Sequence, residues 1–202
     1  MLIEFSQYSA NQIYHIMTQS LIPRPIAWVL TENTTSDYNL APFSYFTPVS
    51  SKPAVLMISV GQKSDQSDKD TWANIKRNER FTVHIASSNL LADLNESSRE
   101  LARNDSELNR LGLTIDHDQG FARIAEAPVA YDCCLHDAQV LKGSKQQLIF
   151  AEVKQAFVAD NCVQKDVKGR LAIDAEAIDP LARLGVSEYA VLGSVLNKAR
   201  PK

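Results

Sequence analysis

The chain lacks the features of a disulfide-stabilised or membrane-spanning protein. Its three cysteines are odd in number, and two of them, Cys133 and Cys134, are adjacent, where a bridge would strain the peptide between them. We therefore expect reduced thiols. No run of about 18 apolar residues occurs, and the amino terminus has no basic segment followed by an apolar stretch. We expect a cytoplasmic location and no membrane partner.

The chain also has little excess charge of either sign. Its 21 Lys and Arg residues nearly balance 24 Asp and Glu residues, which gives a formal net charge of -3 at pH 7. A small negative net charge gives no general attraction for polyanions, so we expect no nucleic-acid partner.

Recognisable metal and hydrolase sites are missing as well. The four histidines share no metal-ligand spacing with one another or with the cysteines, and no serine, histidine and acid arrangement can be identified. The acidic loop 64–70 lacks the glycine and terminal glutamate of an EF-hand calcium loop. We expect Asp116-His117-Asp118 to form a solvated turn and His84 to have a structural role. The sequence therefore nominates no metal ligand and no catalytic side chain.

The chain does have enough apolar residues for one well-formed core. Its 202 residues are 45% hydrophobic, and no repeat, low-complexity tract or long linker marks a boundary. The prediction is a single domain over residues 1–202.

Short segments rich in β-branched and aromatic residues predict an antiparallel sheet. The predicted strands are 26–30, 40–46, 55–60, 81–85, 129–141 and 148–159, the last two forming a hairpin. Helical spacing of apolar residues predicts helices at 11–19, 71–78 and 88–102, with a further turn at 107–111. The predicted helix caps are Ser9, Asp70 or Thr71, and Ser88. The fold class is thus mainly β with inserted helices, closed into a barrel with room for a ligand at its rim.

Five sequence motifs resemble those of a known protein family. They are Pro23-Arg24-Pro25-Ile26-Ala27-Trp28-Val29, Asn39-Leu40-Ala41-Pro42-Phe43-Ser44-Tyr45-Phe46, Lys69-Asp70-Thr71-Trp72-Ala73-Asn74-Ile75, Gly112-Leu113-Thr114 and Leu181-Ala182-Arg183-Leu184-Gly185-Val186-Ser187-Glu188-Tyr189-Ala190. In this order they resemble the flavin reductase-like, FMN-binding split-barrel family over most of the chain. The resemblance implies a Greek-key antiparallel split β-barrel that binds FMN noncovalently. Two departures are Val186, where the family usually has a second glycine, and the loosely matching segment 95–109.

The Lys69-Asp70-Thr71 triplet is a candidate phosphate corner. Lys69 can place a positive charge near phosphate, and Thr71 with the first amides of the following helix can donate hydrogen bonds to an anion. The alternative is that Asp70 or Thr71 caps the helix and Lys69 is a solvated loop residue.

Three other segments complete the candidate site. The segment 39–44 offers a small residue and a proline to a flat ring, or is a half-buried edge strand that tolerates Pro42. Arg24, held between two prolines, can direct its guanidinium at the flavin, or is a surface arginine. The tail segment 183–189 can reach the cofactor, or is a simple terminal strand. The predicted cofactor-binding residues are Arg24, Pro25, Ala27, Asn39, Leu40, Ala41, Pro42, Ser44, Lys69, Asp70, Thr71, Arg183 and Tyr189.

The resemblance implies an NAD(P)H-dependent oxidoreductase that passes a hydride from NADH or NADPH to the flavin N5 atom. Because hydride chemistry belongs to the cofactors, the missing acid–base pair does not count against it. A non-catalytic flavin-binding or flavin-storage protein and an oxidase of an organic substrate remain alternatives. The resemblance also implies a homodimer with the flavin at the subunit boundary and a possible partner monooxygenase. The sequence leaves the choice between NADH and NADPH open.

Overall fold

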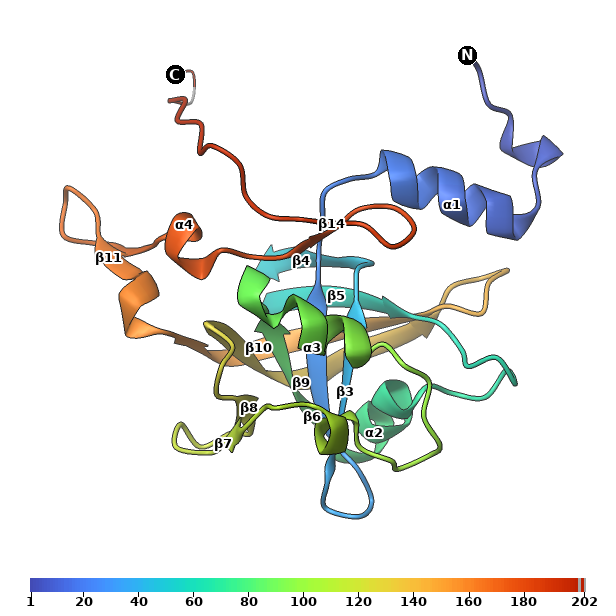
Figure 1. Ribbon diagram of the computed structural model, residues 1–202, viewed down its shortest axis with the longest axis horizontal. Coiled ribbons are helices and arrows are strands. Elements are labelled where there is room, and N and C mark those ends of the chain that lie inside the picture. Colours follow the sequence, from blue (N-terminus) through green and yellow to red (C-terminus); the bar gives the residue numbers. More distant parts are fainter. Residues whose placement is uncertain (200, 202) are drawn as a thin grey trace.

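The computed structural model describes residues 1–199 and 201, and an antiparallel seven-stranded sheet forms its body (Figure 1). The strand order is β3-β2-β6-β9-β10-β5-β4. The strands are β2 (Ala27–Glu32), β3 (Tyr38–Phe43), β4 (Phe46–Ser51), β5 (Ala54–Val60), β6 (Arg80–Ile85), β9 (Val129–Val140) and β10 (Gln147–Val158). The two outermost strands, β3 and β4, are consecutive in the chain and are joined by residues 44–45, so the sheet has to curl. The two strands are not hydrogen-bonded neighbours, and a barrel that is open in this way is a split barrel, which confirms the predicted fold class.

Strand β2 explains how the barrel acquires two apolar layers. Its side chains alternate in direction, yet both faces are buried. Ala27 and Val29 belong to the core cluster inside the barrel, whereas Trp28 and Leu30 belong to a second cluster outside it. The outer cluster is covered by α3 (Leu91–Glu96) and by the short strand β8 (Arg123–Ile124), which contribute Leu94 and Ile124. The helix α3 thereby lies over the sheet beside β3 (Figure 1).

The helices differ from the sequence prediction in length and capping. Helix α1 (Ala10–Ser20) has the predicted cap, since Ser9 and Gln12 form a reciprocal capping box. Helix α2 (Asp70–Asn78) begins one residue earlier than predicted, and its N-cap is Lys69 rather than Asp70 or Thr71. The short α4 (Ala175–Ile178) and the 3-10 turns η1 (Phe5–Gln7) and η4 (Asp160–Cys162) were not predicted.

The helix predicted at 88–102 is wrong in extent. The chain forms a 3-10 turn η2 (Ser88–Leu90) followed by α3, which ends at Glu96. The Ser97 hydroxyl donates to the Leu94 carbonyl at 2.8 Å and the Ser98 hydroxyl to the Asn95 carbonyl at 2.6 Å. Such serine bonds compete with the helical ladder and favour its end. The predicted turn at 107–111 is a 3-10 turn, η3 (Glu107–Arg110).

The strand predicted at 40–46 is in fact interrupted. Strand β3 ends at Phe43, and β4 starts at Phe46 on the opposite edge of the sheet. The predictions for the other five strands hold to within about two residues at each end, as expected for such boundaries.

Several short strands were missed because each has only two or three residues. A small sheet joins β1 (Arg24–Pro25), β13 (Ala182–Arg183) and β14 (Tyr189–Ala190). Two separate hairpins pair β7 (Ile115–Asp116) with β8, and β11 (Val163–Lys165) with β12 (Leu171–Ile173). None of the helices in the described part of the chain has the length and apolar character needed to cross a bilayer.

Candidate functional site

Two hollows lie along strand β3 and share Ser98 at their boundary. The first, of about 190 Å³, is the β14 hollow, lined by Tyr14, Ile26, Pro42, Ser44, Leu94, Asn95, Ser98, Arg183 and Tyr189. The second, of about 50 Å³, is the α2 hollow, lined by Asn39, Ala41, Lys63, Lys69, Asp70, Thr71, Ser97, Ser98, Arg99, Glu100, Leu101 and Glu107. Strand β3 contributes residues to both, so one groove-like region runs from the tail hairpin to the start of α2.

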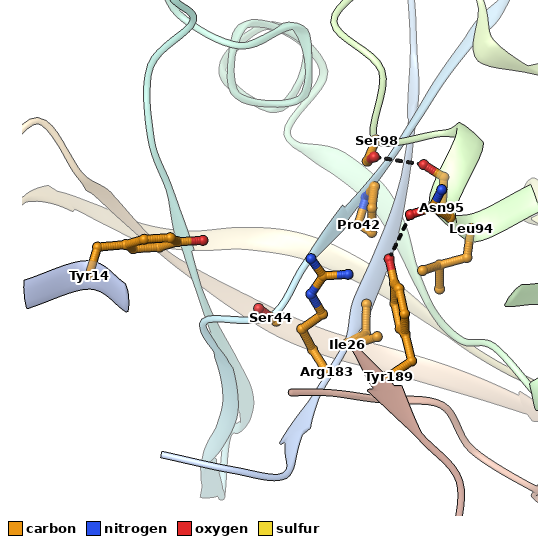
Figure 2. A pocket seen from close by; sticks show the side chains of 9 residues that line it. All are labelled: Tyr14, Ile26, Pro42, Ser44, Leu94, Asn95, Ser98, Arg183 and Tyr189. Atoms are coloured by element: carbon orange, nitrogen blue, oxygen red, sulfur yellow. Dashed lines mark hydrogen bonds between the residues drawn. The ribbon is translucent and has the colours of Figure 1, made fainter. Parts of the chain in front are cut away.

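The β14 hollow has mixed walls, with apolar and aromatic side chains, three neutral polar side chains and one cation (Figure 2). Arg183 and Tyr189 reach into it from the β13–β14 hairpin, and the Arg183 guanidinium lies 4.4 Å from the centre of the Tyr189 ring. The Tyr189 hydroxyl donates to Asn95 Oδ1 at 3.1 Å, which ties the hairpin to α3. Among the described lining residues there is neither a carboxylate nor an imidazole. The hollow therefore suits a flat, partly polar ring better than a group that needs acid–base catalysis.

Close packing against α1 holds the β13–β14 hairpin in place. A Cβ atom at Gly185 would lie 2.2 Å from Gln19 Cγ and 3.1 Å from Gln19 Cα, so only glycine fits there. The next residue, Val186, has φ 54°, an unfavourable region for a β-branched residue. Its carbonyl accepts a hydrogen bond from the Arg183 guanidinium. The turn therefore positions Arg183 at the cost of local backbone strain.

Arg24 is a buried structural connector. Its Nη1 atom donates to the carbonyls of Thr18 at 2.5 Å and Leu21 at 2.8 Å, and its Nη2 atom donates to the carbonyl of Leu184 at 2.6 Å. Its Nε atom lies 3.4 Å from Ser44 Oγ. Only 6% of the residue is exposed. These contacts occupy the guanidinium, so the structure provides a reason for Arg24 that involves no cofactor, and the surface-arginine alternative is wrong.

The N-terminus of α2 opens into the α2 hollow without a side-chain cap. Its N-cap residue, Lys69, has no hydrogen-bond acceptor on its side chain, and no side-chain cap bond is made there. The first amides of a helix have no intrahelical partners and carry partial positive charge. Together with the half-buried Lys69 they form an arrangement that favours an anion. The helix-cap alternative for Asp70 and Thr71 is therefore wrong.

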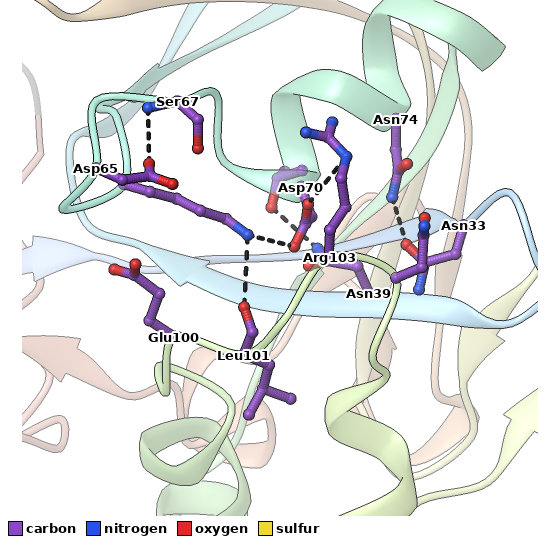
Figure 3. Close-up of polar contacts among 12 residues, drawn as sticks. Asn33, Asn39, Asp65, Ser67, Asp70, Asn74, Glu100, Leu101 and Arg103 are labelled. Atoms are coloured by element: carbon purple, nitrogen blue, oxygen red, sulfur yellow. Dashed lines mark hydrogen bonds and ion pairs between the residues drawn. The ribbon is translucent and has the colours of Figure 1, made fainter.

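A network of polar side chains fixes the walls of the α2 hollow (Figure 3). The amide of Asn39 donates to the hydroxyl of Thr71 at 3.0 Å, and both residues are buried. Lys63 Nζ lies 2.9 Å from Asp70 Oδ2, with both side chains nearly buried. The other oxygen, Asp70 Oδ1, has no hydrogen-bond partner, and Arg103 Nε approaches it at 3.9 Å. The hollow thus has hydrogen-bonded walls and one buried carboxylate oxygen, that of Asp70, without a hydrogen-bond partner.

The predicted site residues separate into three groups. Asn39, Ala41, Lys69, Asp70 and Thr71 line the α2 hollow, and Pro42, Ser44, Arg183 and Tyr189 line the β14 hollow. The remaining residues lie outside both linings: Arg24 and the exposed Pro25 belong to β1, while Ala27 and Leu40 are fully buried in the core. Pro42 does lie on an edge strand, so the edge-strand interpretation of this segment is confirmed. Cofactor contacts for all thirteen residues stay predictions.

His84 and Asp116 have structural explanations. His84 is wholly buried; its Nε2 accepts from the Ile124 amide at 2.9 Å, so its Nδ1, 3.0 Å from the Trp28 carbonyl, is the protonated nitrogen. Burial lowers the pKa of His84 to about 4, which keeps the ring neutral. Asp116 is not simply solvated, because it forms an ion pair with the buried Arg123. Within the described residues, no group of three or more His, Cys, Asp or Glu side chains is placed to hold a metal ion.

Sequence reasoning missed several lining residues, three of them in irregular segments and two on helices. Lys63, Arg99 and Glu107 reach the α2 hollow from loops or a 3-10 turn, and Tyr14 and Asn95 reach the β14 hollow from helices. Asn95, Arg99 and Glu107 lie in the segment 95–109, which resembles the family only loosely, and Tyr14 and Lys63 lie outside every quoted motif.

Comparisons with known proteins identify the family and agree with the fold. The family model described as "Flavin reductase like domain" matches residues 18–171. An uncharacterized protein of Bacillus subtilis, YwrF, is 32% identical over 99% of this chain and 98% of its own. The crystal structure of nitrilotriacetate monooxygenase component B from Bacillus cereus is 30% identical, with a TM-score of 0.89 and 98% of each chain covered. The Pseudomonas fluorescens 2-nitrobenzoate 2-nitroreductase NbaA has the same fold, with a TM-score of 0.87 at 24% identity, covering 100% of this chain and 96% of that one.

Proposed function

The chain belongs to the flavin reductase-like family, and we propose that it binds FMN noncovalently and reduces it with NADH or NADPH. The coarser assignment, a flavin-related oxidoreductase, follows from the family. The observation that supports FMN as the bound flavin is the uncapped N-terminus of α2, which opens into a hollow that adjoins the β14 hollow.

The α2 hollow fits the phosphate of FMN. The unbonded amides at the start of α2 and the hydroxyl of Thr71 donate hydrogen bonds, and Lys69 supplies a positive charge. The polar ribityl chain then extends past Ser98, which both hollows share.

The β14 hollow fits the isoalloxazine ring. Pro42 and Ile26 offer apolar contact, and Tyr189 offers an aromatic edge held by Asn95. When bound, FMN supplies the hydride-accepting ring. Arg183 is the cation in this hollow, so we assign to it, rather than to the occupied Arg24, the stabilisation of negative charge on the reduced pyrimidine edge. The protein otherwise holds the two rings in contact and excludes water.

We also propose that a second copy of the chain completes the site. At about 190 Å³ the β14 hollow is smaller than most ligand pockets, which are about 300–1,000 Å³. Tyr14, which lines it from α1, is 53% exposed, and Met17 on the same helix is 40% exposed. In the tail, Val191 and Leu192 are exposed as well. A symmetric dimer would cover these apolar side chains.

A partner monooxygenase is a further part of the proposal. The similar Bacillus cereus protein is named component B of a monooxygenase, a name that places it in a multicomponent system. By analogy, the reduced flavin made here would serve an oxygenase component.

The test is anaerobic stopped-flow absorbance of the FMN-loaded protein after mixing with NADH or with NADPH. Rapid bleaching of the flavin band, followed by turnover with added free FMN, is the expected result and identifies the donor. Tight FMN binding without bleaching by either donor would contradict reductase activity and favour a flavin-binding or flavin-storage protein. An Arg183→Gln variant should bind oxidised FMN nearly as well but bleach more slowly, with Arg110→Gln, outside both hollows, as the control.

A further inference from the structure

Two side chains from an irregular segment clamp the outer edge of strand β3. The hydroxyl of Ser106 donates to the Tyr38 carbonyl at 2.5 Å, and the amide of Leu40 donates to Glu107 Oε2 at 2.9 Å. Because β3 is an edge strand, these backbone groups have no neighbouring strand to pair with. Ser106 and Glu107 therefore take the place of a missing strand at the position where β3 meets the candidate site.

The carboxyl of Glu107 belongs to the α2 hollow as well as to this clamp. The residue is only 7% exposed, and it lines the hollow together with Lys69 and Thr71. Its contact partner Leu40 directly precedes Ala41, which lines the same hollow. A change at this carboxyl thus acts on both the charge of the hollow and the placement of its wall.

We propose that Glu107 is a positioning residue of the flavin site and that its protonation state regulates how tightly the α2 hollow binds the FMN phosphate. The inference rests on the proposed function, because it takes the phosphate to lie at the start of α2.

The charges facing the hollow are closely balanced. Lys63 from the loop before α2, Lys69 at the start of α2, and Arg99 after α3 are positive. Asp70 in the first turn of α2, Glu100 after α3, and Glu107 in η3 are the carboxylates. Arg103, from the loop before η3, also faces Asp70. Asp70, Glu100 and Arg99 have partners in Lys63, Ser64 and Glu96 respectively. Glu107 is bonded to the Leu40 backbone amide and to no side chain, so the net charge of the hollow depends on whether Glu107 is protonated.

The environment of Glu107 brings its titration close to neutral pH. Burial, together with the nearby charge of Asp70, raises the pKa of Glu107 to about 7, while the Leu40 amide and Lys63 oppose the rise. Below this value the carboxyl is protonated and neutral, and above it a negative charge faces the phosphate. Binding of a phosphate dianion should therefore favour the protonated form and weaken as the pH rises.

The experiment measures dissociation constants for FMN and for riboflavin, which lacks the phosphate, at pH 6.5, 7.5 and 8.5. In the unchanged protein we expect the FMN constant, relative to riboflavin, to rise about sixfold across this range, which is the share of a one-unit pKa coupling that falls between these pH values. Free phosphate monoesters titrate near pH 6, and their dianion gains with pH, so this background runs in the opposite direction. Glu107→Gln keeps an acceptor for Leu40 and removes the ionisation, so it should show only the background. Glu126→Gln changes an exposed carboxylate outside both hollows that likewise accepts a backbone amide, so it is the matched control and should behave like the unchanged protein.

Other outcomes separate failure of this inference from failure of the proposed function. Equal pH profiles for the unchanged protein and Glu107→Gln, with FMN bound more tightly than riboflavin, overturn the role of Glu107 alone. FMN that binds no more tightly than riboflavin at any pH removes the phosphate from the α2 hollow and overturns both. If Glu107→Gln does not fold, calorimetry of the unchanged protein at pH 7.5 in buffers of different ionisation enthalpy decides. Proton uptake on binding FMN, but not riboflavin, is expected, and its absence overturns the inference.

Discussion

Replacing Arg24 with alanine should lower the stability of the protein far more than its affinity for flavin. The guanidinium of Arg24 satisfies the carbonyls of Thr18, Leu21 and Leu184 from a nearly buried position. A buried acceptor left without its partner costs roughly 1–3 kcal/mol. Two of these carbonyls lie in partly buried surroundings that water can reach after truncation, so the lower part of that range applies to each. The sum is a loss of about 3 kcal/mol in the free energy of unfolding.

The assay is thermal and urea unfolding of the flavin-free protein, combined with FMN titration. For a chain of this size, a loss of about 3 kcal/mol lowers the midpoint of thermal unfolding by roughly 6–12 °C. Arg24→Lys is the control: it keeps the positive charge but not the planar fork that reaches three carbonyls, so it should recover less than half of the loss. A destabilisation below about 1 kcal/mol, well under the sum of the orphaned carbonyls, together with a large fall in FMN affinity, would refute the structural role and restore Arg24 as a cofactor contact.

The remaining predictions concern three other residues. Lys69→Met should weaken FMN binding about tenfold and leave riboflavin binding unchanged, because only the phosphate loses a charge partner; equal losses for both flavins would contradict the phosphate position. Val186→Gly should stabilise the protein by about 0.5–1 kcal/mol in thermal unfolding, since relief of strain at φ 54° exceeds the added entropy of the unfolded chain; Val186→Ala, which keeps a Cβ, should gain less, and a larger gain for alanine would count against strain. The pKa of His84 is lowered by burial to about 4, so the unfolded chain binds a proton between about pH 6.5 and 4 that the folded protein does not. Stability should therefore fall as the pH drops through this window, and an NMR titration in which the His84 ring of the folded protein becomes charged above pH 6 would disprove the assignment.

The sheet could be predicted from the sequence because its strands have strong local signals. The run Ile26-Ala27-Trp28-Val29-Leu30 is apolar at every position, and in the structure β2 is buried on both faces. The long hairpin of β9 and β10 was predicted to within about one residue at each end.

The interruption at residues 44–45 and the end of α3 could not be predicted in this way. Both are decided by contacts with distant residues: the Tyr45 carbonyl pairs with the Ser59 amide, and Ser97 Oγ accepts from the indole of Trp28 at 2.8 Å. Local propensity alone favoured a continuous strand and a longer helix.

The two arginines of the candidate site show that residue type alone does not predict whether a side chain has a structural role or lines the site. Arg24 and Arg183 were both predicted as cofactor contacts, and their side chains offer the same chemistry. They pair across β1 and β13, but only Arg24 is buried. Its bond to the Leu184 carbonyl spans 160 positions in the chain and fixes the strand that carries Arg183. The Pro-Arg-Pro motif and the carboxy-terminal motif therefore form one unit, in which Arg24 sets the position from which Arg183 reaches the β14 hollow.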